Sequence, residues 1–291
     1  MIDSFLLNDV VKRALAEDLI YGDRTTEALI LAPLPATGNI VAKEDLVVAG
    51  LDLVQLVFQT LDPSIIFEEK CTPGGSVRKG ELIAQVTGDA GILLKGERVA
   101  LNFLQHLSGI ATLTRRFLDR IQGTPARIVD TRKTTPGLRV FEKEAVRLGG
   151  GGNHRFHLGD LILIKDNHIS LSGGVTEAIR AVQGTRSHSL KIEVEVNTFS
   201  ELEKTLDEGV DIIMLDNMPL NEIKKAVNII KSRAPMTLVE VSGGVNLESV
   251  SEIARCGVHL ISVGALTHSA PAVDISLDIL PASDSGGDLK E

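Results

Sequence analysis

The chain has 291 residues, of which 43% are hydrophobic and 24% are charged, so it is long enough to bury one large core or two modest ones. A net charge of -9, no tryptophan and a single tyrosine argue against nucleic-acid binding, which needs a broad basic surface and often aromatic stacking platforms. No apolar run reaches membrane-spanning length, and two cysteines are too few for a disulfide framework, so we expect a cytoplasmic protein without membrane contact.

The N-terminal part of the chain predicts an α+β domain, because helix and strand patterns do not alternate regularly there. Residues 8–19 have the pattern of an amphipathic helix, and a long helical pattern covers residues 94–123. The apolar runs typical of strands lie at 38–48, 65–69 and 82–86. We therefore place a first domain at 1–115, joined by the C-terminal segment 272–291, and a second domain at 116–271.

The second domain predicts a parallel α/β barrel, because short β-branched runs alternate with helical patterns. The expected strands are 127–130, 161–165, 191–196, 211–216, 237–242 and 260–264. Six strands are fewer than the eight of a closed barrel. The barrel is therefore expected to be incomplete, or to recruit a seventh strand near Asp274 to Leu280.

Positive charge is concentrated in one stretch of this acidic chain. Between Arg127 and His168 there are eight Lys or Arg residues against five Asp or Glu, whereas the rest of the chain has 22 against 34. A local basic cluster in a protein that otherwise repels polyanions indicates a small, highly charged anionic substrate.

Polar residues follow each expected strand, as they do at the mouth of a β/α barrel. In chain order the strand ends carry Thr131, Arg132 and Lys133, then Lys165, Asp166, Asn167 and His168, then Glu195, then Asp216 and Asn217, then Ser242, Gly243 and Gly244, and finally Gly264 and Ala265. Arg132, Lys133, Arg155 and Lys165 are the candidate ligands of carboxylates or phosphates. Lys143 and Arg147 fall on the helix that follows, where we expect solvated or dipole-complementing roles outside the site.

Two glycine-containing segments could bring backbone amides close to an anion. Glycines 149–152 precede His154 and Arg155, and a run of four glycines has an entropic cost that favours a functional reason. His154 could donate to a substrate or make a structural hydrogen bond. The glycines that end the last two strands favour a phosphate site, with a tight turn as the plainer alternative.

Glu195 and Asp216 bring two carboxylates to an otherwise positive basin. They could bind ribose hydroxyls or a phosphate-bound magnesium ion, or stabilise positive charge that develops at a sugar carbon. Ion pairing with lysines of the site is the alternative. Glu193 shares the face of Glu195, so either one could reach the substrate.

The motifs of the whole chain, taken in order, resemble the quinolinate phosphoribosyltransferase family. They are EDLIYGDRTT, GERVALNFLQHLSGIAT, DTRKTTPGLR, GGGGNHR, LIKDNHI, VEVEV, MLDN, VEVSGG and ISVGAL. The resemblance implies a type II phosphoribosyltransferase with an N-terminal α/β sandwich domain and an open α/β barrel. It also implies homodimers or larger assemblies of dimers, in which an arginine from the neighbouring subunit, here matched by Arg98, completes each site.

The resemblance further implies a role for each matched residue. Arg132, Lys133, His154, Arg155 and Lys165 match the pocket for the two carboxylates of quinolinate and for pyrophosphate, and Thr131 beside them is also expected to bind substrate. Glu195 and Asp216 match acids on the ribose and metal side, and Ser242, Gly243, Gly244 and Gly264 match the phosphate cradle. The segment 157–160 departs from the family pattern. Lys133, Lys165, Glu195 and Asp216 are the expected catalytic residues, and Mg2+ held with phosphoribosyl pyrophosphate is the expected cofactor.

Three other functions remain open from the sequence. A paralogue of the same fold, such as the molybdenum-locus relative or a nicotinate phosphoribosyltransferase, would use another acceptor. A phosphosugar aldolase would use Lys165 as a Schiff-base nucleophile. A non-catalytic protein would bind the anion without turnover.

Overall fold

The computed structural model describes residues 4–282, and its contacts divide the chain into two compact units. Unit 1 contains the chain up to Leu113, the segment Thr135–Gly150 and the chain from Ala270 onward, and unit 2 contains Thr114–Thr134 and Gly151–Ser269. The domain division made from the sequence stays a prediction. It differs from the contact units chiefly at residues 135–150, and its last residues, 283–291, lie outside the described part of the chain.

Unit 1 is built on an antiparallel sheet in the order β12-β1-β5-β3. Its strands are β1 (Pro35–Ala42), β3 (Ile66–Glu69), β5 (Leu82–Asp89) and β12 (Ile275–Pro281). The sequence predicted a strand near Asp274 to Leu280 and left open whether the barrel recruits it, and in the structure this strand belongs to the sheet of unit 1. This strand pairs with β1 from Ala42–Ile275 to Ala36–Pro281, because antiparallel pairing satisfies the backbone groups along that side of β1.

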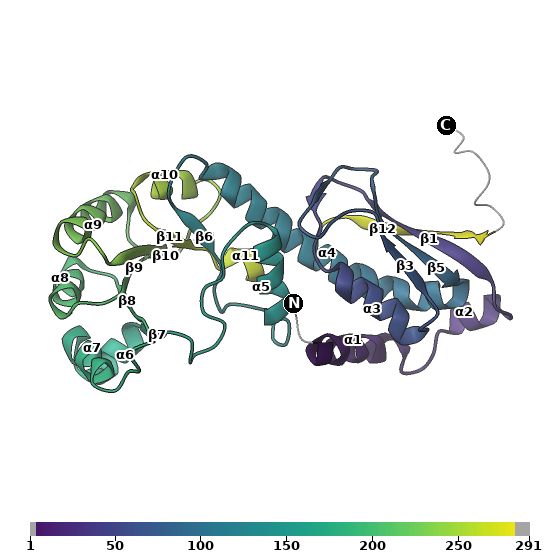
Figure 1. The fold of residues 1–291 in the computed structure, drawn as a ribbon, viewed down its shortest axis with the longest axis horizontal. Coiled ribbons are helices and arrows are strands. Elements are labelled where there is room, and N and C mark those ends of the chain that lie inside the picture. The colour runs from purple at the N-terminus through teal and green to yellow at the C-terminus, as the bar shows by residue number, and fades with distance from the viewer. Residues whose placement is uncertain (1–3, 283–291) are drawn as a thin grey trace. The chain divides into compact units, whose positions relative to one another are not determined.

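Unit 1 also contains five described helices, and the longest of them runs beside this sheet (Figure 1). They are α1 (Ser4–Leu19), α2 (Arg24–Leu29), α3 (Leu51–Leu61), α4 (Ala90–Arg120, which continues into unit 2) and α5 (Arg139–Leu148). A small ribbon pairs β2 (Leu46–Val47) with β4 (Ser76–Val77). Gly96 lets α4 approach α3 closely, since a Cβ there would lie 2.7 Å from the Phe58 ring. None of the described helices is long and apolar enough to cross a membrane.

The helix α5 corrects one expectation about charge. Lys143 was expected to be solvated, yet it is fully buried, as is its neighbour Glu142. The Glu142 carboxylate accepts the Thr135 N–H at 3.0 Å and lies 2.9 Å from His106 Nε2. Arg147, by contrast, is exposed and pairs with Glu144 within the helix.

Unit 2 is an open barrel of parallel strands in the order β6-β11-β10-β9-β8-β7. The strands are β6 (Arg127–Val129), β7 (Ile162–Ile164), β8 (Ile192–Val196), β9 (Ile212–Asp216), β10 (Leu238–Ser242) and β11 (Leu260–Ser262). All six confirm the sequence prediction. Because β6 and β7 lie at opposite edges of the sheet, the described strands do not close into a ring.

The helices of unit 2 connect these strands, and Figure 1 shows α7 to α9 along the outer side of the sheet. They are α6 (Asp166–Ser172), α7 (Val175–Gln183), α8 (Phe199–Glu208), α9 (Leu220–Arg233), α10 (Val250–Arg255) and α11 (Ala265–His268). Every residue of β8 is buried, as expected for a sheet covered on both faces. On one face β8 carries Val194, and on the other it carries Glu193 and Glu195.

Candidate active site

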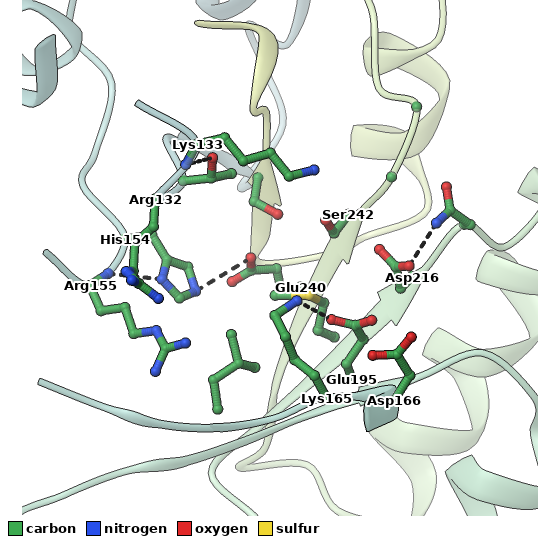
Figure 2. A pocket seen from close by; sticks show the side chains of 17 residues that line it. Arg132, Lys133, His154, Arg155, Lys165, Asp166, Glu195, Asp216, Glu240 and Ser242 are labelled. Carbon is green, nitrogen blue, oxygen red and sulfur yellow. Dashed lines mark hydrogen bonds and ion pairs between the residues drawn. The ribbon is translucent and has the colours of Figure 1, made fainter. Parts of the chain in front are cut away.

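A cavity of about 570 Å³ lies at the carboxyl ends of the unit 2 strands (Figure 2). Eleven of the thirteen residues expected at the site line it: Thr131, Arg132, Lys133, His154, Arg155, Lys165, Glu195, Asp216, Ser242, Gly243 and Gly244. The other two lie elsewhere. Arg98 is exposed on α4 in unit 1, and Gly264 touches the site only indirectly, since a Cβ there would lie 3.3 Å from Lys133 Cδ.

The loop after β6 presents two cations from a fixed backbone. Lys133 N–H donates to Thr131 Oγ1 at 3.0 Å, and Lys133 C=O accepts from Thr267 Oγ1 at 2.7 Å. The Arg132 Nε atom is buried and has no hydrogen-bond partner among the described residues. A buried donor left without an acceptor is costly, so the Arg132 guanidinium fits a site that an anion completes.

Arg155 lies beside Arg132, and each raises the cost of charging the other. Its Nη1 donates to Leu161 C=O at 3.0 Å. Burial, and then the positive charge of Arg132, lower the pKa of Arg155 below its ordinary value, although a guanidinium stays charged at neutral pH. Two neighbouring cations in a partly buried wall favour an anionic ligand that bridges them.

His154 is neutral in the observed hydrogen-bond arrangement. Its Nδ1 accepts the Arg155 N–H at 2.8 Å, so that nitrogen carries no proton. Its Nε2 lies 3.1 Å from Glu193 Oε2, where an N–H can donate to the carboxylate. His154 therefore contributes orientation to this wall rather than a positive charge.

The structure separates the two glutamates that the sequence could not distinguish. Glu195 lines the cavity and forms an ion pair with Lys165 Nζ. Glu193 is fully buried and faces His154. Asp216 also lines the cavity, and its carboxylate accepts from Asn217 Nδ2 at 2.6 Å.

The loop after β10 depends on glycine. Gly243 and Gly244 have φ values of 90° and 62°, a region that side chains disfavour. A Cβ at Gly243 would lie 2.3 Å from Asn217 Oδ1 and 2.8 Å from Asn217 N. Glycine at this position is therefore required by the close approach of two loops at the cavity mouth.

The glycine run at 149–152 has a different role from the one expected. None of these glycines lines the cavity. Gly149 N–H continues the helical hydrogen bonding at the end of α5. Gly152 pairs with Val129 on β6, and its N–H donates to Ile128 C=O at 2.8 Å. The absence of a side chain at Gly152 thus allows a close backbone approach to β6, since a Cβ there would lie 3.2 Å from Val129 Cγ1.

Six further residues line the cavity: Leu163, Asp166, Met214, Asn217, Glu240 and Ser262. Asp166 and Asn217 were expected at strand ends, and the other four were missed from the sequence. Glu240 had a usable signal, because it lies two residues before Ser242 in β10 and so shares its face. A charged residue inside an apolar strand therefore indicates a site residue as much as a charged residue at the end of the strand does.

Comparison with known proteins assigns both units to one kind of enzyme. Residues 23–108 match the quinolinate phosphoribosyl transferase N-terminal domain, and residues 110–278 match the C-terminal domain. The chain is 43% identical to a carboxylating nicotinate-nucleotide pyrophosphorylase of Mycobacterium leprae, over 93% of this chain and 96% of that protein. It is 44% identical to a decarboxylating quinolinate phosphoribosyltransferase of Nicotiana tabacum, over 94% and 82%.

A solved structure shows the same architecture. The nicotinate-nucleotide pyrophosphorylase of Francisella tularensis superposes with a TM-score of 0.91 at 35% identity, over 96% of this chain and 98% of that one. The open α/β barrel and the mixed N-terminal unit are therefore those of this fold.

Proposed function

Because the chain belongs to the quinolinate phosphoribosyltransferase family, we propose that the cavity in unit 2 is where it binds quinolinate and phosphoribosyl pyrophosphate. The chain carries out the reaction of that family: it transfers the phosphoribosyl group to quinolinate with loss of CO2. The products are nicotinate mononucleotide, pyrophosphate and CO2, in the synthesis of NAD. The observation that supports this location is the wall formed by Arg132 and Arg155. They are two adjacent cations, and the buried Nε of Arg132 has no hydrogen-bond partner among the described residues.

The cations have a direct electrostatic task. Both substrates are multiply charged anions, and two unit charges 4 Å apart repel by about 4 kcal/mol at a typical effective dielectric constant near a protein surface. Arg132 and Arg155, with Arg98 from a neighbouring subunit, would bind the quinolinate carboxylates. Lys133 and Lys165 would offset the charge of the departing pyrophosphate.

Two carboxylates of the cavity would stabilise positive charge on the substrate. When the pyridine nitrogen attacks the anomeric carbon, the ribosyl ring acquires oxocarbenium character, and Glu195 or Asp216 would stabilise it. The ion pair between Lys165 and Glu195 holds both groups in place before substrate arrives. After transfer, CO2 leaves from the ring carbon next to the new bond, the positive ring nitrogen stabilises the electron pair left on that carbon, and the carbon then takes up a proton from solvent.

Magnesium fits the mouth of the cavity better than its interior. Mg2+ prefers oxygen ligands and commonly enters with substrate phosphates. Of the two carboxylates expected to hold it, Glu195 is already paired with Lys165, whereas Asp216 bonds only a neutral amide among the described interactions. We propose that Asp216 is the protein ligand of a phosphate-bound Mg2+, whose charge would assist the departure of pyrophosphate.

The 5′-phosphate of the ribose would bind at the loop of Ser242, Gly243 and Gly244, with Gly264 nearby. Backbone N–H groups at glycine loops after barrel strands commonly bind phosphate. A Gly243→Ala substitution should raise the KM for phosphoribosyl pyrophosphate roughly tenfold or more, because a side chain is strained at this φ and displaces Asn217. Steady-state kinetics with each substrate varied in turn would measure the change.

Gly209→Ala is the matched control for that substitution. Gly209 has a φ of 68°, but a Cβ there meets nothing within 4 Å. The control should lose about 1 kcal/mol of stability and keep both KM values. An unchanged KM for phosphoribosyl pyrophosphate in the Gly243 variant would remove this loop from the phosphate site.

A homodimer, or a larger assembly of dimers, is part of the proposal. Unit 1 exposes large apolar side chains that are 71% to 86% accessible: Phe5, Ile20, Tyr21, Leu29 and Leu31. Exposed apolar residues of this size, where they gather, mark interaction surfaces. Arg98 is also exposed in unit 1, which supports its reaching the cavity of another subunit.

Product analysis tests the proposed function directly. The purified protein, given quinolinate, phosphoribosyl pyrophosphate and Mg2+, should form nicotinate mononucleotide and CO2 in equal amounts, and a chelator should stop turnover. Nucleotide formed only from nicotinate would favour the paralogue, and binding without turnover would favour the anion-binding protein. The aldolase alternative is weakened because Lys165 is held as an ion pair by Glu195, and a protonated amine is a poor nucleophile.

A further inference from the structure

A group of three titratable residues adjoins the cationic wall of the cavity, and two of them, His154 and Glu240, line the cavity themselves. Glu193 on β8 and Glu240 on β10 are fully buried, and the His154 side chain is 10% exposed. His154 Nε2 lies 3.1 Å from Glu193 Oε2 and 3.7 Å from Glu240 Oε1. Figure 2 shows Glu240 between His154 and the ion pair of Lys165 with Glu195.

If both carboxyl groups of this group were ionised, their buried oxygens would lack a hydrogen-bond donor, and one added proton would supply it. Glu193 Oε1 and both carboxyl oxygens of Glu240 are buried without a partner among the described residues. The His154 N–H faces both carboxyl groups, and the Ser262 hydroxyl also interacts with Glu240. Two ionised carboxylates buried around these neutral donors would be very costly, so a carboxyl proton held between the glutamates is the arrangement that the geometry favours.

The titration of Glu240 agrees with this arrangement. Burial, and then the negative charge of Glu193, raise the pKa of Glu240 to about 8. At neutral pH Glu240 is therefore mostly in its acid form, and its O–H can supply the missing hydrogen bond.

A metal ion is the alternative occupant of this group. One donor atom from each of His154, Glu193 and Glu240 lies within 4.8 Å of the others. However, His154 Nδ1 accepts a backbone N–H, so a metal on Nε2 would leave the imidazole ring with no proton. Metal-bound histidines normally donate from their other nitrogen, and this ring cannot.

We propose that Glu240 and Glu193 are positioning residues for quinolinate binding: they hold one proton between them and, through His154, fix the backbone of Arg155. The chain of contacts runs from Glu193 to His154 Nε2, and from His154 Nδ1 to the Arg155 N–H. The Arg155 side chain extends from this fixed backbone into the wall that would bind carboxylates, where its Nη1 donates to Leu161 C=O. This inference rests on the proposed function.

The shared proton has a consequence for binding. Once Glu240 ionises, a second negative charge lies in the barrel interior beneath the carboxylate site. The charged groups of the cavity and of the contacts around His154 are Glu193 and Glu195 on β8, Lys165 and Asp166 after β7, Asp216 on β9, Asp130, Arg132 and Lys133 after β6, and His154 and Arg155 before β7. An added buried charge repels the quinolinate dianion more strongly than a surface charge would, so affinity should fall above about pH 8.

Quinolinate binding and protonation of Glu240 are thermodynamically linked. The protonated form of Glu240 binds the dianion more tightly, so quinolinate binding raises the pKa of Glu240 further. The carboxyl groups of quinolinate themselves are ionised well below this range, as ordinary carboxyls are. A fall in affinity between pH 7.5 and 9.5 would therefore come from a titrating group of the protein and not from the ligand.

The test measures quinolinate binding by calorimetry, without phosphoribosyl pyrophosphate, from about pH 7 to 9.5. In the unmodified protein the Kd should rise with pH above about 8, approaching tenfold per pH unit if the ionised form does not bind. Glu240→Gln keeps a neutral hydrogen-bonding group and should give a flat profile. Its KM for quinolinate should likewise become independent of pH over this range.

The control variant is Thr205→Val. Thr205 on α8 is another fully buried polar side chain of unit 2 without a hydrogen-bond partner among the described residues, and it does not line the cavity. This variant should keep the alkaline rise in Kd. If Glu240→Gln does not fold, Glu240→Met provides a second neutral side chain of similar length.

Two results would overturn the inference. One is a Kd for the unmodified protein that does not change between pH 7 and 9.5, and the other is an alkaline rise that persists in folded Glu240→Gln. Lack of turnover by the unmodified protein would instead sink the proposed function, because calorimetry still reads quinolinate binding when no reaction occurs.

Discussion

An Arg132→Ala substitution should lower kcat/KM for quinolinate by about 10²- to 10³-fold, since it removes charge-assisted hydrogen bonds worth roughly 3 to 4 kcal/mol together. The Arg132 Nε is buried without a partner among the described residues, so the site loses its best-prepared donor. Arg132→Lys should recover only part of the loss, because an ammonium cannot reproduce bidentate contact with a carboxylate. Steady-state kinetics at saturating phosphoribosyl pyrophosphate would give both values.

Arg233→Ala is the matched control for this loss of an arginine. Arg233 is in unit 2 and pairs with Glu203 and Asp207 on the surface. Surface pairs contribute at most about 1 kcal/mol, so the control should keep kcat/KM and lose little stability. A wild-type kcat/KM in folded Arg132→Ala would show that carboxylates bind elsewhere.

The barrel strands could be predicted because the signal for each is local. A short β-branched run between helical patterns identifies a parallel strand, and all six appear in unit 2. The pairing of β12 with β1 could not be predicted in the same way. Ile275 pairs with Ala42, and no pattern within either segment names a partner so distant in the chain.

Most of the candidate site could be predicted for a related reason. In a parallel sheet the carboxyl ends of all strands meet at one edge, so Arg132, Lys165 and Asp216 were expected to converge and they line one cavity. How deeply each side chain is buried along its strand was harder to predict. Glu195 and Glu193 share a face, but two residues along a strand span about 6 to 7 Å, enough to place one in the cavity and the other behind it.

Sequence patterns could not predict the protonation of His154 or the burial of Lys143 on its helix. Nothing in the residues around His154 predicts that its Nδ1 accepts a backbone N–H, which makes the ring neutral. Lys143 occupies a helix position that looked exposed, yet it is fully buried. A helical pattern identifies an apolar face, but it does not say what will cover the rest of the helix.

Mixing two inactive variants should restore activity if the sites are shared between subunits. Arg98→Ala and Arg132→Ala would each be nearly inactive alone, because every site would lack one arginine. In a mixed dimer, the subunit with an intact Arg132 would receive an intact Arg98 from its partner. Random exchange makes about half of the dimers mixed, with one intact site each, so about a quarter of wild-type activity should return.

The size of that recovery separates shared sites from self-contained ones. If Arg98 acted within its own subunit, each mixed dimer would combine two defective sites, and mixing would return nothing above the sum of the parents. Each variant incubated with itself controls for reactivation during exchange, and light scattering reports whether dimers persist. Recovery near a quarter would place Arg98 in the neighbour's cavity, where one more cation would offset the repulsion between the two substrates.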